Sequence, residues 1–339
     1  MTTSRTGVLL VQLGGPQSRE ELRPFLYELF VDPEILSIPW KPARMLVAWL
    51  ISTVRAPKSA ETYEKIGWSP IRCWSEKQAV LLEEALRDCH GHADPYSSPK
   101  VRVGMTCSRP SVEEALEELR KAGTTTLVVL PLYPQYSVTT TKGAFARVTT
   151  ALAEMKWAPA RLDAPDAWYD EPGFLDAHAG RIEEAARALP DPDPAKTILL
   201  YSAHSLPVST VEKKKDPYPR HIEATVKAID ARIGHRYRSR LGYQSKVGTM
   251  PWLGPSTPDV LKELAAAGER QVLVVPVAFV SDHVETLYEI RMLFADEAKA
   301  LGIPHYVAAD GLNDHPDFIR GLADLTRRTL KKGGARGAV

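Results

Sequence analysis

The chain has 339 residues, 44% of them hydrophobic and 25% charged, which is enough to bury the core of one or two α/β domains. Its net charge of +1 gives no general attraction to nucleic acid, so nucleic-acid binding is disfavoured. No segment has about 18 uninterrupted apolar residues and no signal peptide is recognisable, so the sequence predicts a cytoplasmic protein without a membrane span.

The first predicted element is an apolar strand at residues 7–13, which runs into the turn Gly14-Gly15-Pro16. Glycine in such a turn lets the backbone approach a ligand closely. Neither a GxGxxG nor a GxxxxGK[ST] pattern occurs in the chain, so the sequence gives no support for dinucleotide or phosphate binding.

Residues 35–54 (ILSIPWKPARMLVAWLISTV) combine two tryptophans with many large aliphatic side chains. Lys41 and Arg44 are the only basic residues there, and Glu34 lies just before the segment. This composition predicts either a helix that faces the core or an interfacial patch, and in the second case the protein makes peripheral contact with a membrane.

Two longer segments repeat one plan at a constant offset of 145 residues, at 111–133 and 256–278. Each predicts an amphipathic helix, a glycine at the end of the helix, and a buried strand with proline near its end. The matched positions are Leu116, Leu119, Gly123 and Pro131 in the first copy and Leu261, Leu264, Gly268 and Pro276 in the second.

Apolar strands that run into turns also open both halves of the chain, at residues 7–16 and 197–207. Because strand and helix patterns alternate within each half, we predict an α/β fold with an internal duplication. It would comprise two doubly wound, Rossmann-like domains with parallel sheets and a ligand cleft between them. We place the N-terminal domain at residues 1–160, the C-terminal domain at 161–330 and a short tail at 331–339.

Unusual residues follow several of these strands. Tyr133 opens a hydroxyl-rich stretch (YPQYSVTTT) that suits a flat ligand, although tyrosine at a strand end is commonly structural. His204 in YSAHSLP suits proton transfer or metal binding, or else it is a hydrogen-bonded structural histidine. Ser205 beside it lacks the GxSxG elbow of a hydrolase. Trp252 can stack on a planar ligand or pack beneath a loop.

The apolar run at residues 271–280 opens directly into acids and one histidine, VSDHVETLYE. On a helix Glu285 and Glu289 point to one side, with Asp282 and His283 at its start. Like charges on one face repel unless a cation or a proton lies between them, so this cluster predicts metal handling or proton transfer. The alternative is a capping box between Asp282 and Glu285, with His283 exposed to solvent.

Taken together, five segments resemble the ferrochelatase family in order and spacing from about residue 7 to residue 330: QLGGP, PLYPQYS, YSAHSLP, YQSKVG with MPWLGP, and FVSDHVETLYE. The resemblance implies an enzyme of haem biosynthesis that inserts Fe2+ into protoporphyrin IX and releases two protons. It implies His204 and Glu285 as catalytic residues. It further implies porphyrin contacts from Leu13, Tyr133, Trp252 and Phe279, and handling of the Fe2+ substrate by His204, Glu285, Glu289, Asp282 and His283.

The chain departs from the family pattern in three places. Residues 66–70 (IGWSP) stand where many members have a three-glycine run before Ser-Pro, so the local loop must differ. Thr106 and Cys107 replace an arginine and a tyrosine that relatives commonly carry near the porphyrin. Arg291 and Leu293 interrupt the acid series after Glu289, which predicts a shorter acidic path.

The cysteines leave two alternatives. Some family members bind a [2Fe-2S] cluster through a cysteine after PQYS and three more in a C-terminal tail, but here Val138 holds the first position and the tail has no cysteine. Cys73, Cys89 and Cys107 fall near His90 and His92, so they either bind an internal cluster or are reduced structural thiols. The resemblance itself requires no cofactor.

Other functions remain as alternatives to a protoporphyrin chelatase. They are a chelatase that acts on coproporphyrin III, a non-catalytic tetrapyrrole carrier, and a serine hydrolase with Ser205 as nucleophile. The expected partners are a porphyrin, Fe2+ and, through residues 35–54, the inner face of a membrane. We expect a monomer or a homodimer.

Overall fold

The computed structural model describes residues 5–36, 38–87, 99–165, 167–246 and 250–333. The chain divides into two compact units. The first comprises Met1–Tyr133, Ser137–Trp168 and Ile319–Val339, and the second comprises Pro134–Tyr136 and Tyr169–Phe318. The sequence placed residues 319–330 in the second domain, whereas their contacts group them with the first unit.

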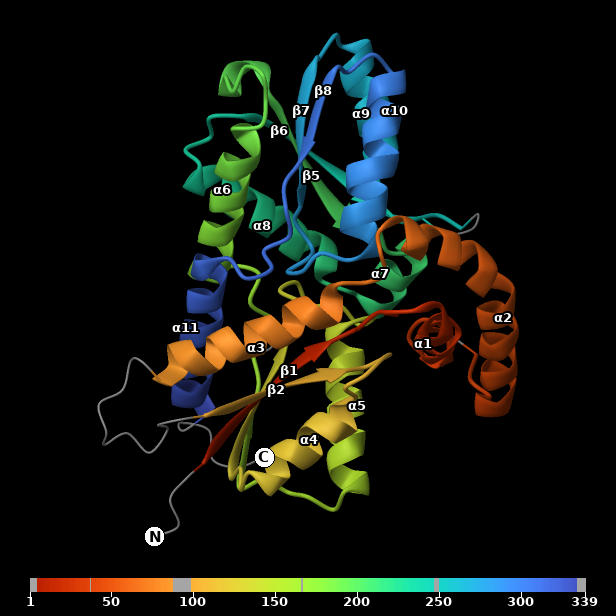
Figure 1. Cartoon of the computed structure of the whole chain (residues 1–339), viewed down its shortest axis with the longest axis vertical. Coiled ribbons are helices and arrows are strands. Elements are labelled where there is room, and N and C mark those ends of the chain that lie inside the picture. Colours follow the sequence, from red (N-terminus) through yellow and green to blue (C-terminus); the bar gives the residue numbers. More distant parts are fainter. Residues whose placement is uncertain (1–4, 37, 88–98, 166, 247–249, 334–339) are drawn as a thin grey trace. The chain divides into compact units, whose positions relative to one another are not determined.

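The first unit is a parallel four-stranded sheet in the order β2-β1-β3-β4 with helices on both faces (Figure 1). Every residue of β1 is buried, as expected for a strand that is covered on both sides. The elements are β1 (Thr6–Gln12), α1 (Arg19–Val31), α2 (Lys41–Lys65), α3 (Ile71–Arg87), β2 (Lys100–Met105), α4 (Val112–Lys121), β3 (Thr126–Pro131), α5 (Thr141–Glu154), β4 (Arg161–Asp163) and α11 (Pro316–Gly333).

The second unit repeats this topology in a parallel sheet of order β6-β5-β7-β8. Its helices also cover both faces of the sheet (Figure 1). The elements are α6 (Pro172–Ala186), a short 3-10 turn (Pro194–Lys196), β5 (Ile198–His204), α7 (Val208–Lys214), α8 (Tyr218–Arg232), β6 (Arg238–Gln244), α9 (Thr257–Ala266), β7 (Gln271–Pro276), the π-helix η2 (Glu285–Leu293), α10 (Phe294–Ala300) and β8 (His305–Ala308). The predicted fold class and the internal duplication are thereby confirmed.

The same local device joins strand to helix in both units. A Cβ atom on Gly104 of β2 would lie 2.9 Å from the Cα of Val112, where α4 begins. A Cβ atom on Gly242 of β6 would lie 2.9 Å from the Cα of Thr257, where α9 begins. Only glycine permits this approach. Both halves of the sequence have a glycine at this position, and the strand therefore packs closely on the helix in both units.

Helices α1 and α2 pack on each other, and α2 turns its large apolar side chains outward. The buried residues of α2 are small apart from one tyrosine: Ala48, Ser52, Ala60 and Tyr63. In contrast Trp40 is 69% exposed and Val54 is 77% exposed, and the intervening exposed residues are Met45, Leu46, Trp49 and Leu50. The alternative of a helix that faces the core is therefore wrong for this apolar face, which we call the α2 face.

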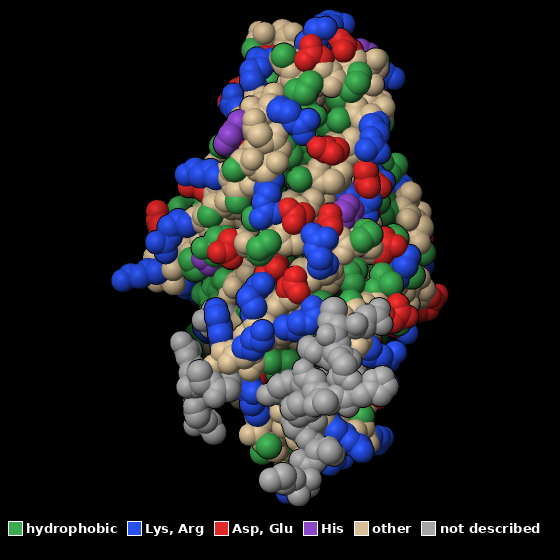
Figure 2. All heavy atoms as spheres, turned by 90° about the vertical axis from the view of Figure 1, so that its left-hand side faces the viewer, with side chains coloured by type: hydrophobic (Ala, Val, Ile, Leu, Met, Phe, Trp, Pro, Cys, Tyr) green, Lys and Arg blue, Asp and Glu red, His purple; other side chains and the backbone are tan. Residues whose placement is uncertain are grey.

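One face of the molecule carries mixed charge (Figure 2). Figure 2 shows acidic and basic side chains interspersed over the described part of the face that it presents. Among the described helices, none is both long enough and apolar enough to cross a membrane.

Candidate active site

The candidate site lies at the carboxyl end of the sheet of the second unit. His204 is the last residue of β5, and it is the one residue of that strand that is not buried. Strand β5 runs between β6 and β7, so the segments that leave these two strands flank His204. Ligands commonly bind at this edge of open parallel sheets.

Four side chains meet at this edge, from the end of β5, the end of β6 with the residue that follows it, and the start of η2. His204 Nδ1 lies 2.8 Å from Oε2 of Glu285, which is the first residue of η2. The same carboxylate oxygen accepts hydrogen bonds from Ser245 Oγ at 2.7 Å and from Gln244 Nε2 at 3.2 Å. The histidine side chain is 38% exposed and that of Glu285 only 19%, so the imidazole faces outward while its acid partner is enclosed.

Ser245 also connects Glu285 to the second acid. Its Oγ lies 2.8 Å from Oε2 of Glu289, in addition to its bond with Glu285. A serine hydroxyl has a single proton, so it can donate to only one of the two carboxylates at a time. Both contacts are hydrogen bonds at once when Glu289 carries a proton and donates it to Ser245 Oγ.

The pKa shifts in the site agree with a proton on Glu289 and an ionised Glu285. Burial alone would lower the pKa of His204, but the charge and the hydrogen bond of Glu285 outweigh it and raise the pKa. Burial would raise the pKa of Glu285, but the two histidines hold it well below its usual value. Burial and the neighbouring charge of Glu285 raise the pKa of Glu289 to about 7. The site therefore combines an ionised acid with one that changes its charge near neutral pH.

Asp282 has a structural environment. Its Oδ2 accepts a hydrogen bond from Asn313 Nδ2 at 2.7 Å, and its Oδ1 accepts from Thr286 Oγ1 at 2.7 Å and from the Gly311 amide at 3.3 Å. The Asp282 amide donates to Asn313 Oδ1 at 2.8 Å. The capping box between Asp282 and Glu285 is thus wrong, because the partners of both carboxylates lie elsewhere.

His283 lies beside Glu285 rather than in solvent. Its Nε2 is 3.6 Å from Glu285 Oε1, and its side chain is only 13% exposed. The Phe279 ring lies against it, with the two ring centroids 4.4 Å apart. The structure therefore brings together five of the predicted residues, namely His204, Glu285, Glu289, His283 and Phe279. Gln244 and Ser245 join them, although no pattern in the sequence predicted a role for either residue.

Trp252 and Ser205 lie on segments that adjoin His204. Trp252 is half-buried and pairs with Pro207 in an isolated antiparallel bridge. Ser205 is 0% exposed, and its Oγ donates a hydrogen bond to the Leu253 carbonyl oxygen at 3.0 Å. A hydroxyl that is enclosed in this way cannot attack a substrate, so the hydrolase alternative is wrong.

Leu13 and Tyr133 belong to the first unit, where they follow the neighbouring strands β1 and β3. The Leu13 carbonyl accepts a hydrogen bond from the Cys107 amide at 2.9 Å. Tyr133 packs against the core formed by β1, β3, α4 and α5. Leu13, Tyr133 and Cys107 thus lie at the carboxyl edge of this sheet. The first two are predicted porphyrin contacts, and Cys107 is one of the departures from the family pattern.

The structure describes two of the three cysteines. Cys73 is exposed on α3, Cys107 is buried, and Cys89 lies outside the described residues. Burial raises the pKa of the Cys107 thiol to about 12, which disfavours the thiolate that a cluster requires. Within the described ranges, no group of three or more His, Cys, Asp or Glu side chains is arranged to hold a metal ion.

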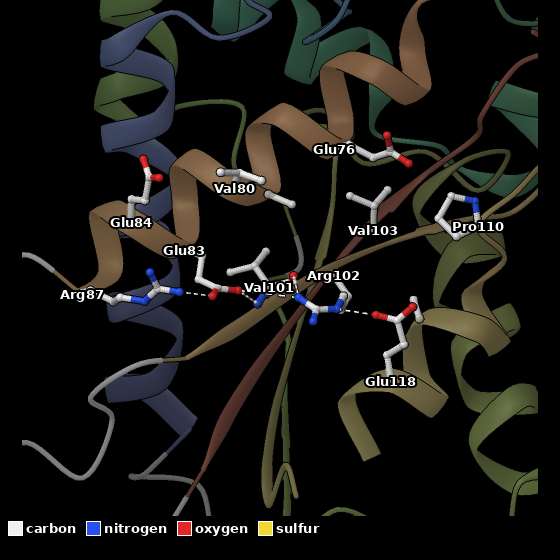
Figure 3. Close-up of a pocket in the computed structure, with 12 residues that line it drawn as sticks. Glu76, Val80, Glu83, Glu84, Arg87, Val101, Arg102, Val103, Pro110 and Glu118 are labelled. Atoms are coloured by element: carbon white, nitrogen blue, oxygen red, sulfur yellow. Dashed lines mark hydrogen bonds and ion pairs between the residues drawn. The ribbon is translucent and has the colours of Figure 1, made fainter. Parts of the chain in front are cut away.

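A hollow of about 400 Å³ lies elsewhere, between α3, β2 and α4 of the first unit (Figure 3). Four of its charged side chains form two pairs, Glu83 with Arg87 and Arg102 with Glu118. Glu83 also accepts a hydrogen bond from the Val101 amide. The second unit has the matching pair Arg240 and Glu263 between β6 and α9. These contacts belong to the duplicated framework rather than to a reaction site.

Comparisons with known proteins assign nearly the whole chain to one family. The family model described as Ferrochelatase matches residues 5–330. The Ferrochelatase of Synechococcus sp. (strain JA-3-3Ab) is 42% identical over 334 residues, which cover 96% of this chain and 94% of the relative. The Ferrochelatase of Gloeobacter violaceus is 40% identical over 334 residues, which cover 96% and 98%.

Solved structures show the same fold at low sequence identity. SirB from Bacillus subtilis with Fe3+ has a TM-score of 0.59 and 11% identity, and the match covers 98% of both chains. CbiX, described as the terminal enzyme for biosynthesis of siroheme in denitrifying bacteria, has a TM-score of 0.52 and 14% identity over 95% of this chain and 98% of its own. The family model and the relatives at about 40% identity show that this chain belongs to the ferrochelatase family of chelatase enzymes.

Proposed function

We propose that this chain inserts Fe2+ into protoporphyrin IX at the site formed by His204 and Glu285. The observation that carries the proposal is the 2.8 Å pair of imidazole and carboxylate, which Ser245 extends to Glu289. Metallation replaces two pyrrole protons of the ring with one Fe2+, so a chelatase needs proton acceptors beside the ring nitrogens.

The hydrogen-bonded series His204, Glu285, Ser245 and Glu289 supports a proton route. Consecutive partners lie 2.7–2.8 Å apart. His204 is the exposed end of the series, and Glu289, with a pKa of about 7, can accept or release a proton near neutral pH. We therefore assign His204 to the porphyrin side of the route and Glu289 to its far end. His283, which lies beside Glu285, supports the charge of this group.

Trp252 and Phe279 are the porphyrin contacts that we propose in the second unit. Each lies on a segment that leads to or from the site residues, and both present flat rings that suit a planar tetrapyrrole. Leu13 and Tyr133 of the first unit remain predictions from the family pattern. The Fe2+ ion is a substrate in this scheme.

An anaerobic absorbance assay with Fe2+ tests the proposal, with protoporphyrin IX and coproporphyrin III in separate cuvettes. We expect faster metallation of protoporphyrin IX. A preference for coproporphyrin III would assign the chain to that substrate instead. Tight porphyrin binding without any metallation would contradict the proposed reaction.

We further propose that the α2 face makes peripheral contact with a membrane surface. The exposed tryptophans Trp40 and Trp49 are typical of residues at a membrane interface. Arg23 lies over the Trp49 ring, 5.4 Å from its centroid, and can reach lipid phosphates beside the apolar face. Such contact would bring the enzyme to a poorly water-soluble porphyrin.

A further inference from the structure

One loop of the second unit carries Trp252 and is held mainly by hydrogen bonds rather than by burial. We call residues 250–255 the Trp252 loop. Met250, Pro251 and Gly254 in this loop are exposed, while Trp252 and Leu253 are half-buried. Because so little of the loop is buried, its position depends on its polar contacts.

Three of those contacts run to the segment that follows His204. A fourth joins the end of the loop to β6, where the Tyr243 amide donates to the Pro255 carbonyl at 2.9 Å. The Leu253 amide donates to the Leu206 carbonyl at 2.9 Å, and the Val208 amide donates to the Pro251 carbonyl at 3.0 Å. Ser205 adds a side-chain bond, because its Oγ donates to the Leu253 carbonyl at 3.0 Å. Both polar backbone atoms of Leu253 are thus bonded to residues 205–206.

Ser205 itself is held firmly. Its amide donates to the Gln244 carbonyl at 2.9 Å, and the preceding carbonyl, that of His204, accepts from Tyr218 Oη at 2.9 Å. The peptide group between His204 and Ser205 is therefore fixed at both of its polar atoms. The buried Ser205 hydroxyl connects this fixed peptide to the Trp252 loop.

We propose that Ser205 is a positioning residue that holds the Trp252 loop at a fixed place relative to the His204 imidazole. The inference rests on the proposed function, in which Trp252 contacts the porphyrin and His204 faces its pyrrole nitrogens. A ring that lies against Trp252 then presents its nitrogens to His204 in one geometry. Small misplacements of reacting groups lower reaction rates by large factors. The loss of the single hydroxyl that positions the loop should therefore lower kcat.

The test compares Ser205→Ala with the matched control Ser75→Ala. Ser75 of α3 is also 0% exposed, and its Oγ also donates to a backbone carbonyl, that of Ile71, at 2.8 Å. Amide hydrogen exchange should become faster at Leu253 and Val208 in Ser205→Ala only. The porphyrin dissociation constant should rise and kcat should fall by about 10-fold or more, while KM for Fe2+ stays unchanged.

Equal exchange at these two amides in both variants would overturn the inference, as would porphyrin affinity and kcat equal to those of Ser75→Ala. If the wild-type protein metallates no porphyrin, the proposed function fails, but the exchange measurement and a porphyrin absorbance titration still decide the role of Ser205. Ser205→Cys, which keeps a weaker donor, should give intermediate exchange and replaces the alanine variant should that variant not fold.

Discussion

The imidazole of His204 and the carboxylate of Glu285 meet at 2.8 Å although 81 positions separate them in the chain. One residue ends a central strand, and the other begins the helix that follows the adjacent strand. Parallel pairing of β5 and β7 places both strand ends at the same edge, and this pairing turns two distant motifs into one site.

The change His204→Ala should lower kcat for metallation by about 100-fold or more, because general acid–base groups contribute factors of this size. Porphyrin affinity should change little, since the lost group acts in the chemical step. Stopped-flow metallation and a porphyrin fluorescence titration measure the two quantities. Full turnover in this variant would remove His204 from the reaction.

The change Glu285→Gln should lower the pKa of His204. Burial of the imidazole remains in this variant, whereas the carboxylate charge that outweighs burial is gone. An NMR titration of the labelled histidines measures the pKa of His204. The spectrum of His315→Gln is a control, because the signal missing from it belongs to His315. A His204 pKa that stays raised would mean that a group other than Glu285 stabilises the imidazolium.

The carboxyl group of Glu289 should make the protein less stable as pH rises. Its pKa is about 7 in the folded protein, whereas the ordinary value of 4.5 applies to the unfolded chain. Between these two pH values the folded chain therefore binds more protons than the unfolded chain. The free energy of unfolding therefore falls as pH increases through this interval. Denaturant unfolding at pH 5 and pH 8 should show a smaller difference in Glu289→Gln than in wild type. An equal difference in both proteins would contradict the raised pKa.

The change Asp282→Asn should reduce the free energy of unfolding by about 1.5–3 kcal/mol, the range for hydrogen bonds to charged groups. The buried carboxylate accepts three bonds that join the start of η2 to Gly311 and Asn313. Asp324→Asn is the control, because the Asp324 side chain is 47% exposed and its ion pair with Arg327 should contribute about 1 kcal/mol or less. An Asp282 variant of unchanged stability but lower affinity for Fe2+ would instead favour a role in metal handling.

The paired change Leu46→Ser and Leu50→Ser should weaken binding to vesicles of mixed phosphatidylcholine and phosphatidylserine. Both side chains lie on the α2 face, so their loss removes apolar surface without opening the core. Val80→Ser is a matched control, because Val80 is also an exposed aliphatic residue but lies on α3. Co-sedimentation measures the binding. Equal sedimentation of all three proteins would argue against membrane contact through α2.

The sequence predicted the parts of this structure that depend on local pattern. The repeat at an offset of 145 residues placed α4 with α9 and β3 with β7, because each copy carries its own helix cap and its own buried strand. The assignment of residues 319–330 needed tertiary contacts, because an amphipathic helix shows which of its faces is buried but not the unit against which it packs.

The site was predicted less completely than the fold. The sequence singles out His204, Glu285 and Glu289 because their residue types suit the chemistry, but the same reasoning selects the carboxylate of Asp282, whose hydrogen bonds are structural. Ser245 was missed because a serine after a strand is an ordinary turn residue. Ser245 stands out only in the structure, because two carboxylates lie within 2.8 Å of its hydroxyl. A sequence pattern does not show such a contact between distant segments.

The outward-facing side chains of α2 also determine how the isolated protein behaves in concentrated solution. A net charge of +1 provides little long-range repulsion between copies of the chain. Two copies that meet through Trp40, Leu46 and Val54 bury apolar surface that is exposed in the single chain. Lipid-free stocks should therefore self-associate as their concentration rises, and a mild detergent that covers α2 should keep them dispersed.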